Sequence, residues 1–267
     1  MSLVAALPMY DFPWTRRAND ALWGNLALRL RAANIAAPLE LSRGEDIDAL
    51  WRDPKLLFAQ TCGYPYFKGL REAVRLVATP VYDFDGCRGA EHCAFLIAAK
   101  GDAGGLEEFR GARAACNALD SNSGMNLFRA LIAPLAQEKR FFSSIVWTGS
   151  HFESLRAVAS GRAALAAIDC VSFGQMAMGA PELVDKARVV ARSPMSPGPP
   201  FIASAKLPDD HVRALREALD AALRDPSLAP ALQILRLKQV EILSEVDYGR
   251  IATLERDAIA LGYPTLA

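Results

Sequence analysis

The chain has 267 residues, of which 52% are hydrophobic and 22% charged, which is typical of a globular protein and excludes a disordered one. Its 30 Lys and Arg residues balance 30 Asp and Glu residues, which argues against a nucleic-acid-binding surface. No apolar run reaches the roughly 18 residues that a transmembrane helix needs, so we expect no membrane span. The length suits one large domain or two lobes of about 100–150 residues each.

The first third of the chain alternates predicted strands and helices. An apolar run over residues 4–7 predicts a strand, and apolar spacing predicts a helix over 14–33. Further strands are expected at 38–41, 56–59 and 76–82, with a short helix over 45–51. This alternation indicates a mainly parallel sheet with right-handed crossovers.

A second series of strands and helices follows. Strands are expected at 95–99, 113–117, 143–148 and 164–169, and helices at 106–109, 125–136, 153–160 and from 174 onward. A Pro- and Gly-rich stretch at 193–200 marks a crossover, and amphipathic helices at 209–224 and 247–261 close the chain.

These patterns predict an α/β fold with two lobes. Each lobe is expected to be a mostly parallel sheet flanked by helices, with a ligand cleft between the lobes. Residues 1–92 and 187–267 would form a discontinuous lobe 1, on which the last helices pack, and residues 93–186 would form lobe 2.

Polar residues cluster after two strands of the second series. The segment 120–126 reads Asp-Ser-Asn-Ser-Gly-Met-Asn and precedes a predicted helix, whose first amides and dipole favour an anion. The segment 148–151, Thr-Gly-Ser-His, follows the next strand. Ordinary helix caps use the same residue types. Because ligands gather at the carboxyl ends of strands in α/β sheets, the candidate anion ligands are Ser121, Asn122, Ser123, Gly124, Asn126, Thr148, Ser150 and His151.

Other candidates lie at further strand ends. Asp169 ends a buried strand, where it can accept from a ligand amine or hydroxyl, cap a helix, or act as a hinge partner. Tyr10 and Tyr64 follow predicted strands of the first series, and Tyr82 ends the predicted strand over 76–82. Packing alone explains each tyrosine, but their shared position would gather three phenols at one sheet edge.

The cysteines and histidines do not form a metal or catalytic motif. Five cysteines at irregular spacing make neither a disulfide framework nor a zinc motif, and we expect no metal and no cofactor. Cys62 with Cys87, or Cys87 with Cys93, are candidate disulfides, and free buried thiols are the alternative. The sequence has no GxSxG, P-loop, GxGxxG or HExxH motif.

Together these motifs resemble the phosphate-, phosphite- and phosphonate-binding proteins of ABC importers, within the type 2 periplasmic-binding-protein fold. The resemblance covers roughly residues 4–205 and rests on the segments 6–11, 60–65, 120–126, 148–151 and 167–170. It implies a solute-binding protein that closes around a small oxyanion and works with an ABC permease. It also implies that Ser121, Ser123, Gly124, Ser150 and His151 hold the anion, that Tyr64 and Tyr82 close over it, and that Asp169 lies near a ligand amino group. A Cys62–Cys87 disulfide in an oxidising compartment is implied as well.

The sequence leaves the cellular compartment and the role of the protein open. The N-terminus shows no basic stretch and no cleavage site, which fits a cytoplasmic protein or a periplasmic one whose signal has been removed. We expect a monomer. The alternatives to an importer subunit are a cytoplasmic enzyme on the same scaffold, of the menaquinone or thiamine-precursor type, and a ligand-binding sensor or accessory subunit. In an enzyme, Asp169 or His151 would serve as acid or base.

Overall fold

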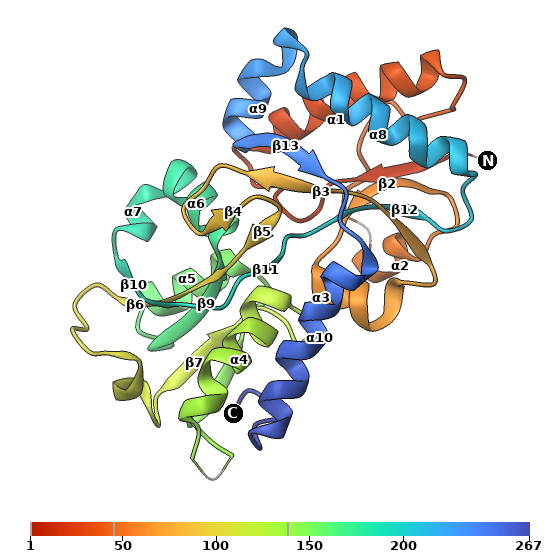
Figure 1. The fold of residues 1–267 in the computed structure, drawn as a ribbon. Helices are drawn as coiled ribbons and strands as arrows, with labels where there is room; N and C mark the ends of the chain where they lie inside the picture. Colours follow the sequence, from red (N-terminus) through yellow and green to blue (C-terminus); the bar gives the residue numbers. More distant parts are fainter. Residues whose placement is uncertain (1, 45, 138) are drawn as a thin grey trace. The chain divides into compact units, whose positions relative to one another are not determined.

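The chain divides into two compact units, each built from separate stretches of sequence. The structure is a computed structural model that describes residues 2–44, 46–137 and 139–267 (Figure 1). Unit 1 comprises Met1–Asp83 and Gly198–Asp247, and unit 2 comprises Phe84–Pro197 and Tyr248–Ala267. The expected lobe boundaries at 92/93 and 186/187 therefore differ from those of the two units.

Unit 1 contains a mixed five-stranded sheet. Its strand order is β1 (Val4–Ala6), β2 (Leu56–Gln60), β12 (Phe201–Ser204), β3 (Val74–Tyr82) and β13 (Leu237–Glu241). The strands β1, β2 and β3 share one direction, as the strand–helix alternation predicts, whereas β12 and β13 run antiparallel to their neighbours. The strand predicted over 38–41 is wrong. There the Pro38 carbonyl accepts from the Trp23 indole at 3.1 Å rather than from a neighbouring strand.

The helices of unit 1 flank this sheet. They are α1 (Arg16–Ala32), α2 (Ile47–Trp51), α3 (Gly63–Pro65), the π-helical turn η1 (Tyr66–Leu70), α8 (Asp209–Leu223), the 3₁₀ turn η5 (Pro226–Leu228) and α9 (Ala229–Leu235). The helix predicted over 45–51 begins at Ile47, because the Asp46 carboxylate accepts from the amides of Asp48 and Ala49 and caps it. Glu45 lies outside the described residues.

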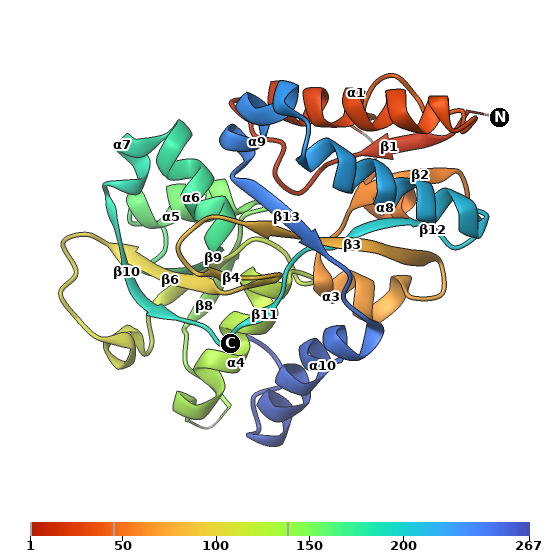
Figure 2. The same ribbon diagram turned by 45° about the horizontal axis from the view of Figure 1, so that its top comes forward.

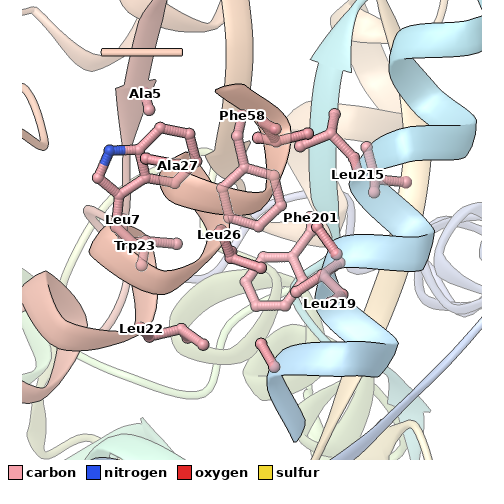
Figure 3. Packing of buried hydrophobic residues seen from close by; sticks show 14 of the residues in the cluster. Ala5, Leu7, Leu22, Trp23, Leu26, Ala27, Phe58, Phe201, Leu215 and Leu219 are labelled. Carbon is pink, nitrogen blue, oxygen red and sulfur yellow. The ribbon is translucent and has the colours of Figure 1, made fainter. Parts of the chain in front are cut away.

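The core of unit 1 lies between the sheet and helices α1 and α8 (Figure 3). The Trp23 ring stacks on Phe58 at 5.7 Å between centroids, and Phe58 packs on Phe201 at 4.9 Å. Leu215 and Leu219 of α8 face these rings. Because burial of each large apolar side chain stabilises by about 1.5–3 kcal/mol, this cluster fixes α1 and α8 against β2 and β12.

Unit 2 contains a second five-stranded sheet (Figure 2). Its order is β10 (Ala187–Arg192), β6 (Ala94–Ala99), β9 (Leu165–Asp169), β7 (Arg113–Cys116) and β8 (Ser144–Trp147). The strands β9, β7 and β8 are parallel, and β6 is antiparallel to both β9 and β10. A small antiparallel sheet joins β11 (Ser196–Pro197), β5 (Glu91–His92) and β4 (Cys87–Arg88).

The helices of unit 2 are mostly short. They are η2 (Leu106–Phe109), η3 (Asn122–Leu127), α4 (Phe128–Ile132), η4 (Ala133–Leu135), α5 (His151–Ala159), α6 (Cys170–Gly179), α7 (Pro181–Val184) and most of α10 (Glu245–Ala260). The helix predicted over 125–136 begins earlier, at η3, where the Asn126 amide donates to the Ser121 carbonyl five residues back in a π-helical turn. Among the helices that the structure describes, none is long and apolar enough to cross a membrane.

The C-terminal helix corrects one expectation from the sequence. Residues 248–267 group with unit 2 and not with the first lobe. Asn126 Nδ2 donates to the Ile251 carbonyl at 3.2 Å, and Arg129 donates to the Pro264 carbonyl at 2.8 Å and lies 3.6 Å from Glu255. These partners are distant in sequence, so the amphipathic pattern of α10 alone does not indicate which lobe it joins.

Candidate functional site

The three parallel strands of unit 2 end at one edge of the sheet. Cys116 of β7 pairs with Trp147 of β8, and Ala115 of β7 pairs with Ala166 of β9. The segments that follow these strands therefore leave the sheet side by side, as the carboxyl ends of parallel strands do. Both polar segments predicted to hold an anion lie at this edge.

Four residues from these segments form one cluster, which we call the Ser–His cluster: Asn117, Ser123, Gly124 and His151. Ser123 Oγ lies 3.0 Å from His151 Nε2. A Cβ atom at Gly124 would overlap Asn117 Oδ1 and lie 3.2 Å from His151 Cε1. Glycine at position 124 thus permits the close approach of the other three side chains. Asn117 was missed as a site residue because it reads as the end of a strand.

The electrostatics of the Ser–His cluster favour a polar ligand. Burial lowers the pKa of His151, against smaller opposing effects of Asp169 and the Ala167 backbone, so the ring is neutral at pH 7. Within the described part of the chain, Asn117 Oδ1 and His151 Nδ1 are buried and make no hydrogen bond of standard geometry. Because unsatisfied buried polar atoms cost free energy, a ligand with matching groups would stabilise this arrangement.

Three of the predicted ligand hydroxyls stabilise local structure. Ser121 Oγ accepts from the Gly124 amide at 3.0 Å and caps η3, and Ser150 Oγ accepts from the Glu153 amide at 3.1 Å and caps α5. Thr148 Oγ1 lies 2.6 Å from Ser154 Oγ. The ordinary cap is therefore the observed role of Ser121, while both helix starts still bring a positive dipole end to this edge.

Asn122 and Asn126 belong to a buried network. Asn122 Nδ2 donates to Ser196 Oγ at 2.9 Å, and Asn126 Nδ2 donates to Asn122 Oδ1 at 3.2 Å. Arg129 donates to Asn126 Oδ1 at 2.7 Å. These bonds hold the turn that carries Ser123 and Gly124, and a direct ligand contact of either asparagine stays a prediction.

Asp169 caps α6 and forms a buried ion pair. Its Oδ1 accepts from the Ser172 amide at 2.7 Å, and its Oδ2 lies 2.7 Å from His92 Nδ1. Burial alone would raise the pKa of Asp169 and lower the pKa of His92. The attraction between the two side chains outweighs burial in each case, so the pKa of Asp169 is lowered and the pKa of His92 is raised. The helix cap was one of the open alternatives for Asp169. His92 was missed as a partner of Asp169.

Tyr10 and Tyr64 of unit 1 follow β1 and β2, and Tyr82 is the last residue of β3. Tyr10 and Tyr82 pack edge to face, with ring centroids 5.3 Å apart and an interplanar angle of 83°. Gln60, the last residue of β2, donates to Tyr82 Oη at 3.3 Å. Tyr64 lies on α3, where Lys68 Nζ is 5.8 Å from its ring centroid. Gln60 was missed, although it directly follows the predicted strand over 56–59.

The cysteines correct a further expectation. None of the five is in a disulfide in the structure, so neither the expected Cys62–Cys87 bond nor its Cys87–Cys93 alternative is formed. Cys62 precedes α3 in unit 1, whereas Cys87 lies on β4 of unit 2, where its Sγ is 3.6 Å from Cys170 Sγ. Within residues 2–44, 46–137 and 139–267, no group of three or more His, Cys, Asp or Glu side chains is arranged to hold a metal ion.

Comparison with known proteins identifies the family. The model of a family described as "ABC transporter, phosphonate, periplasmic substrate-binding protein" matches residues 44–248, which is more than half of the chain. The chain belongs to this family. It is therefore a solute-binding protein of the ABC-transporter type, from a family of transport proteins and not of enzymes.

Solved structures agree with this assignment at the level of the fold. A binding protein component of an ABC phosphonate transporter from Pseudomonas aeruginosa is 15% identical, with 98% of this chain and 88% of that chain covered and a TM-score of 0.78. PhnD1 from Prochlorococcus marinus in complex with methylphosphonate is 14% identical, with 96% and 97% covered and a TM-score of 0.75. XAC2383 from Xanthomonas citri, bound to chloride ion, is 16% identical, with 98% of each chain covered and a TM-score of 0.74. A search of curated proteins found no match.

Proposed function

We propose that this protein binds phosphate, phosphite or a phosphonate at the Ser–His cluster and delivers it to an ABC permease from the periplasm. The contact between Ser123 and His151, at the common edge of two parallel strands, carries the proposal. It supplies a hydroxyl and an imidazole beside two helix N-termini, which together suit a compact oxyanion. The family match and the methylphosphonate complex of the Prochlorococcus marinus protein support the same ligand class.

The protonation of His151 would adapt to the ligand. Its pKa is lowered by burial, so the ring carries no charge before the anion arrives. A bound anion would favour the protonated ring, because an opposite charge close by raises the pKa of a histidine. The protonated ring donates from both nitrogens, which would strengthen its hold on the anion.

The other predicted ligand residues remain part of the proposal. Tyr10, Tyr64 and Tyr82 would supply apolar walls with polar tips. Asp169 already holds His92 and the Ser172 amide, so we propose that it acts on the ligand site through His92.

Calorimetric titration with phosphate, phosphite, methylphosphonate, aminoethylphosphonate, sulfate and small carboxylates tests this function. Ser123→Ala and His151→Gln should each weaken binding of the preferred phosphorus oxyanion by roughly ten- to a hundredfold, since each removes one charge-assisted hydrogen bond. The protein should remain folded in both variants.

Matched controls use the exposed Ser143 and the His211 that pairs with Asp210 on α8. Ser143→Ala and His211→Gln should leave the affinity unchanged. Unaltered affinity in both Ser123→Ala and His151→Gln, or no binding of any phosphorus oxyanion by the wild type, would refute the proposal.

A further inference from the structure

Three of the five cysteines gather in unit 2, and we call Cys87, Cys93 and Cys170 the thiol cluster. Cys87 Sγ lies 3.6 Å from Cys170 Sγ, and the Cys93 thiol also interacts with that of Cys170. The remaining two are placed elsewhere. Cys116 donates to the Gly124 carbonyl at 3.0 Å, and Cys62 lies in unit 1.

Backbone hydrogen bonds hold the thiol cluster together. The Cys170 amide donates to the Cys93 carbonyl, and the Cys93 amide donates to the Gly86 carbonyl, each at 3.1 Å. Gly86 has a φ of +87°, and a Cβ atom there would lie 2.8 Å from Cys170 Cβ. Glycine at position 86 therefore lets the hairpin of β4 and β5 approach the start of α6 to van der Waals distance.

A second link joins the same two elements. Cys87 pairs across the hairpin with His92, and His92 forms the buried ion pair with Asp169, the residue before Cys170. The backbone bond between Cys170 and Cys93 and the His92–Asp169 pair thus keep the sulfur atoms of Cys87 and Cys170 close together. A disulfide requires the Sγ atoms to approach from 3.6 Å to about 2.05 Å.

The three thiols differ in accessibility. Cys87 is half-buried, whereas Cys93 and Cys170 are 2% and 0% exposed. The hydrogen bond between Cys87 and Cys170 lowers the pKa of Cys87, and the contacts with Cys87 and Cys93 raise that of Cys170. Since the thiolate is the nucleophile in thiol–disulfide exchange, Cys87 is the thiol that an external oxidant would meet.

We propose that Cys87 and Cys170 form a disulfide when the folded protein meets a disulfide-bearing oxidant, while Cys93 stays a thiol. The Cys87 thiolate attacks the oxidant's disulfide, forming a mixed disulfide and releasing one thiol. Cys170 then loses its proton, attacks Cys87 Sγ and releases the second thiol. The two cysteines lose two protons and two electrons, and the oxidant takes them up as it becomes two thiols. This cross-link is independent of the proposed ligand.

Oxidised glutathione serves as the oxidant in the test, applied to the purified full chain. Peptide mapping by mass spectrometry under non-reducing conditions should find one cross-linked pair, Cys87 with Cys170. Because the bond closes a long loop, the Tm of the oxidised protein should exceed that of the reduced protein by about 5–15 °C. Cys87→Ser, at a half-buried position, should lose both the cross-link and the redox-dependent difference in Tm, whereas Cys93→Ser and Cys62→Ser should keep both.

Several results would overturn the proposal. One such result is a different cross-link, of Cys170 to Cys93 or of Cys87 to Cys62. Another is a stable glutathione adduct on Cys87, and a third is the recovery of five unmodified thiols after oxidation. A redox-dependent Tm difference that persists in Cys87→Ser would contradict it as well.

Discussion

At the scale of single residues, the pKa values of two histidines of unit 2 are shifted in opposite directions. The carboxylate of Asp169 raises the pKa of His92, while burial lowers the pKa of His151. His92 is thus paired with a carboxylate within the protein, whereas the ring of His151 contacts Ser123 in the Ser–His cluster. The same residue type therefore serves a structural role in one position and a proposed ligand-binding role in the other.

The buried pair predicts how stability depends on pH. The contribution of His92 is complete below its unfolded-state pKa, near 6.5, and is lost as the pH rises through its raised folded-state pKa. The contribution of Asp169 is complete above its unfolded-state pKa, near 3.8, and is lost as the pH falls through its lowered folded-state pKa. Asp169→Asn should therefore destabilise most at about pH 5–6, by roughly 3–5 kcal/mol, because it leaves His92 buried without its counter-ion.

Urea unfolding of the wild type and of Asp169→Asn between about pH 4 and pH 9 measures this difference. Asp210→Asn, at the exposed pair with His211, is the matched control and should change stability little at any pH. A loss of stability in Asp169→Asn that is the same at every pH would show that the pair is not charged.

At the scale of elements, the network around Asn126 joins η3 to α10. Asn126 receives a hydrogen bond from Arg129 and donates to Asn122 and to the Ile251 carbonyl. Asn126→Ala should lower the free energy of unfolding by about 1–3 kcal/mol, because these buried partners lose their bonds. Affinity for the oxyanion should change much less than in Ser123→Ala.

Urea unfolding of Asn126→Ala measures the loss of stability, and calorimetric titration measures the change in affinity for the oxyanion. Unchanged stability together with a tenfold or greater loss of affinity would make Asn126 a ligand contact, as the sequence pattern predicts, and not a structural link.

The helices that the sequence predicts well are those whose apolar residues recur at a regular helical spacing. The apolar spacing of α1 and α8 predicts both helices to within two residues. The strands β12 and β13 were missed, because what makes them strands is pairing with β2 and β3, far away in the chain. The segment 38–41 has the apolar character of a strand, but Trp23 takes the carbonyl of Pro38.

The sequence places the two polar segments of the candidate site but not the contacts within them. Polar residues after β7 and β8 predict that the two segments lie near one another, and Ser123 of one contacts His151 of the other. Residue type alone cannot separate Ser121, whose hydroxyl caps a helix, from Ser123, whose hydroxyl contacts His151. His92 was missed because its importance comes from a partner 77 residues away.

At the scale of the whole molecule, the absence of net charge bears on ligand capture. With 30 acidic and 30 basic residues, the protein has no formal net charge, so we expect local groups to dominate the attraction of an anion. The association rate constant for the preferred oxyanion should change by less than about threefold between about 0.01 and 0.15 M NaCl.

Stopped-flow tryptophan fluorescence at several salt concentrations measures this rate constant. A fall of tenfold or more would reveal a positive surface near the site that the overall charge balance conceals.

The position of β12 has a consequence for the order in which the protein can fold as it is made. This strand lies at the centre of the unit 1 sheet, between β2 and β3, yet it is translated after nearly all of unit 2. Until the ribosome has passed it, β2 and β3 keep open edges, which are sites of aggregation in an incomplete sheet. We therefore expect the nascent N-terminal segment to stay prone to aggregation for longer than its place at the front of the chain would suggest.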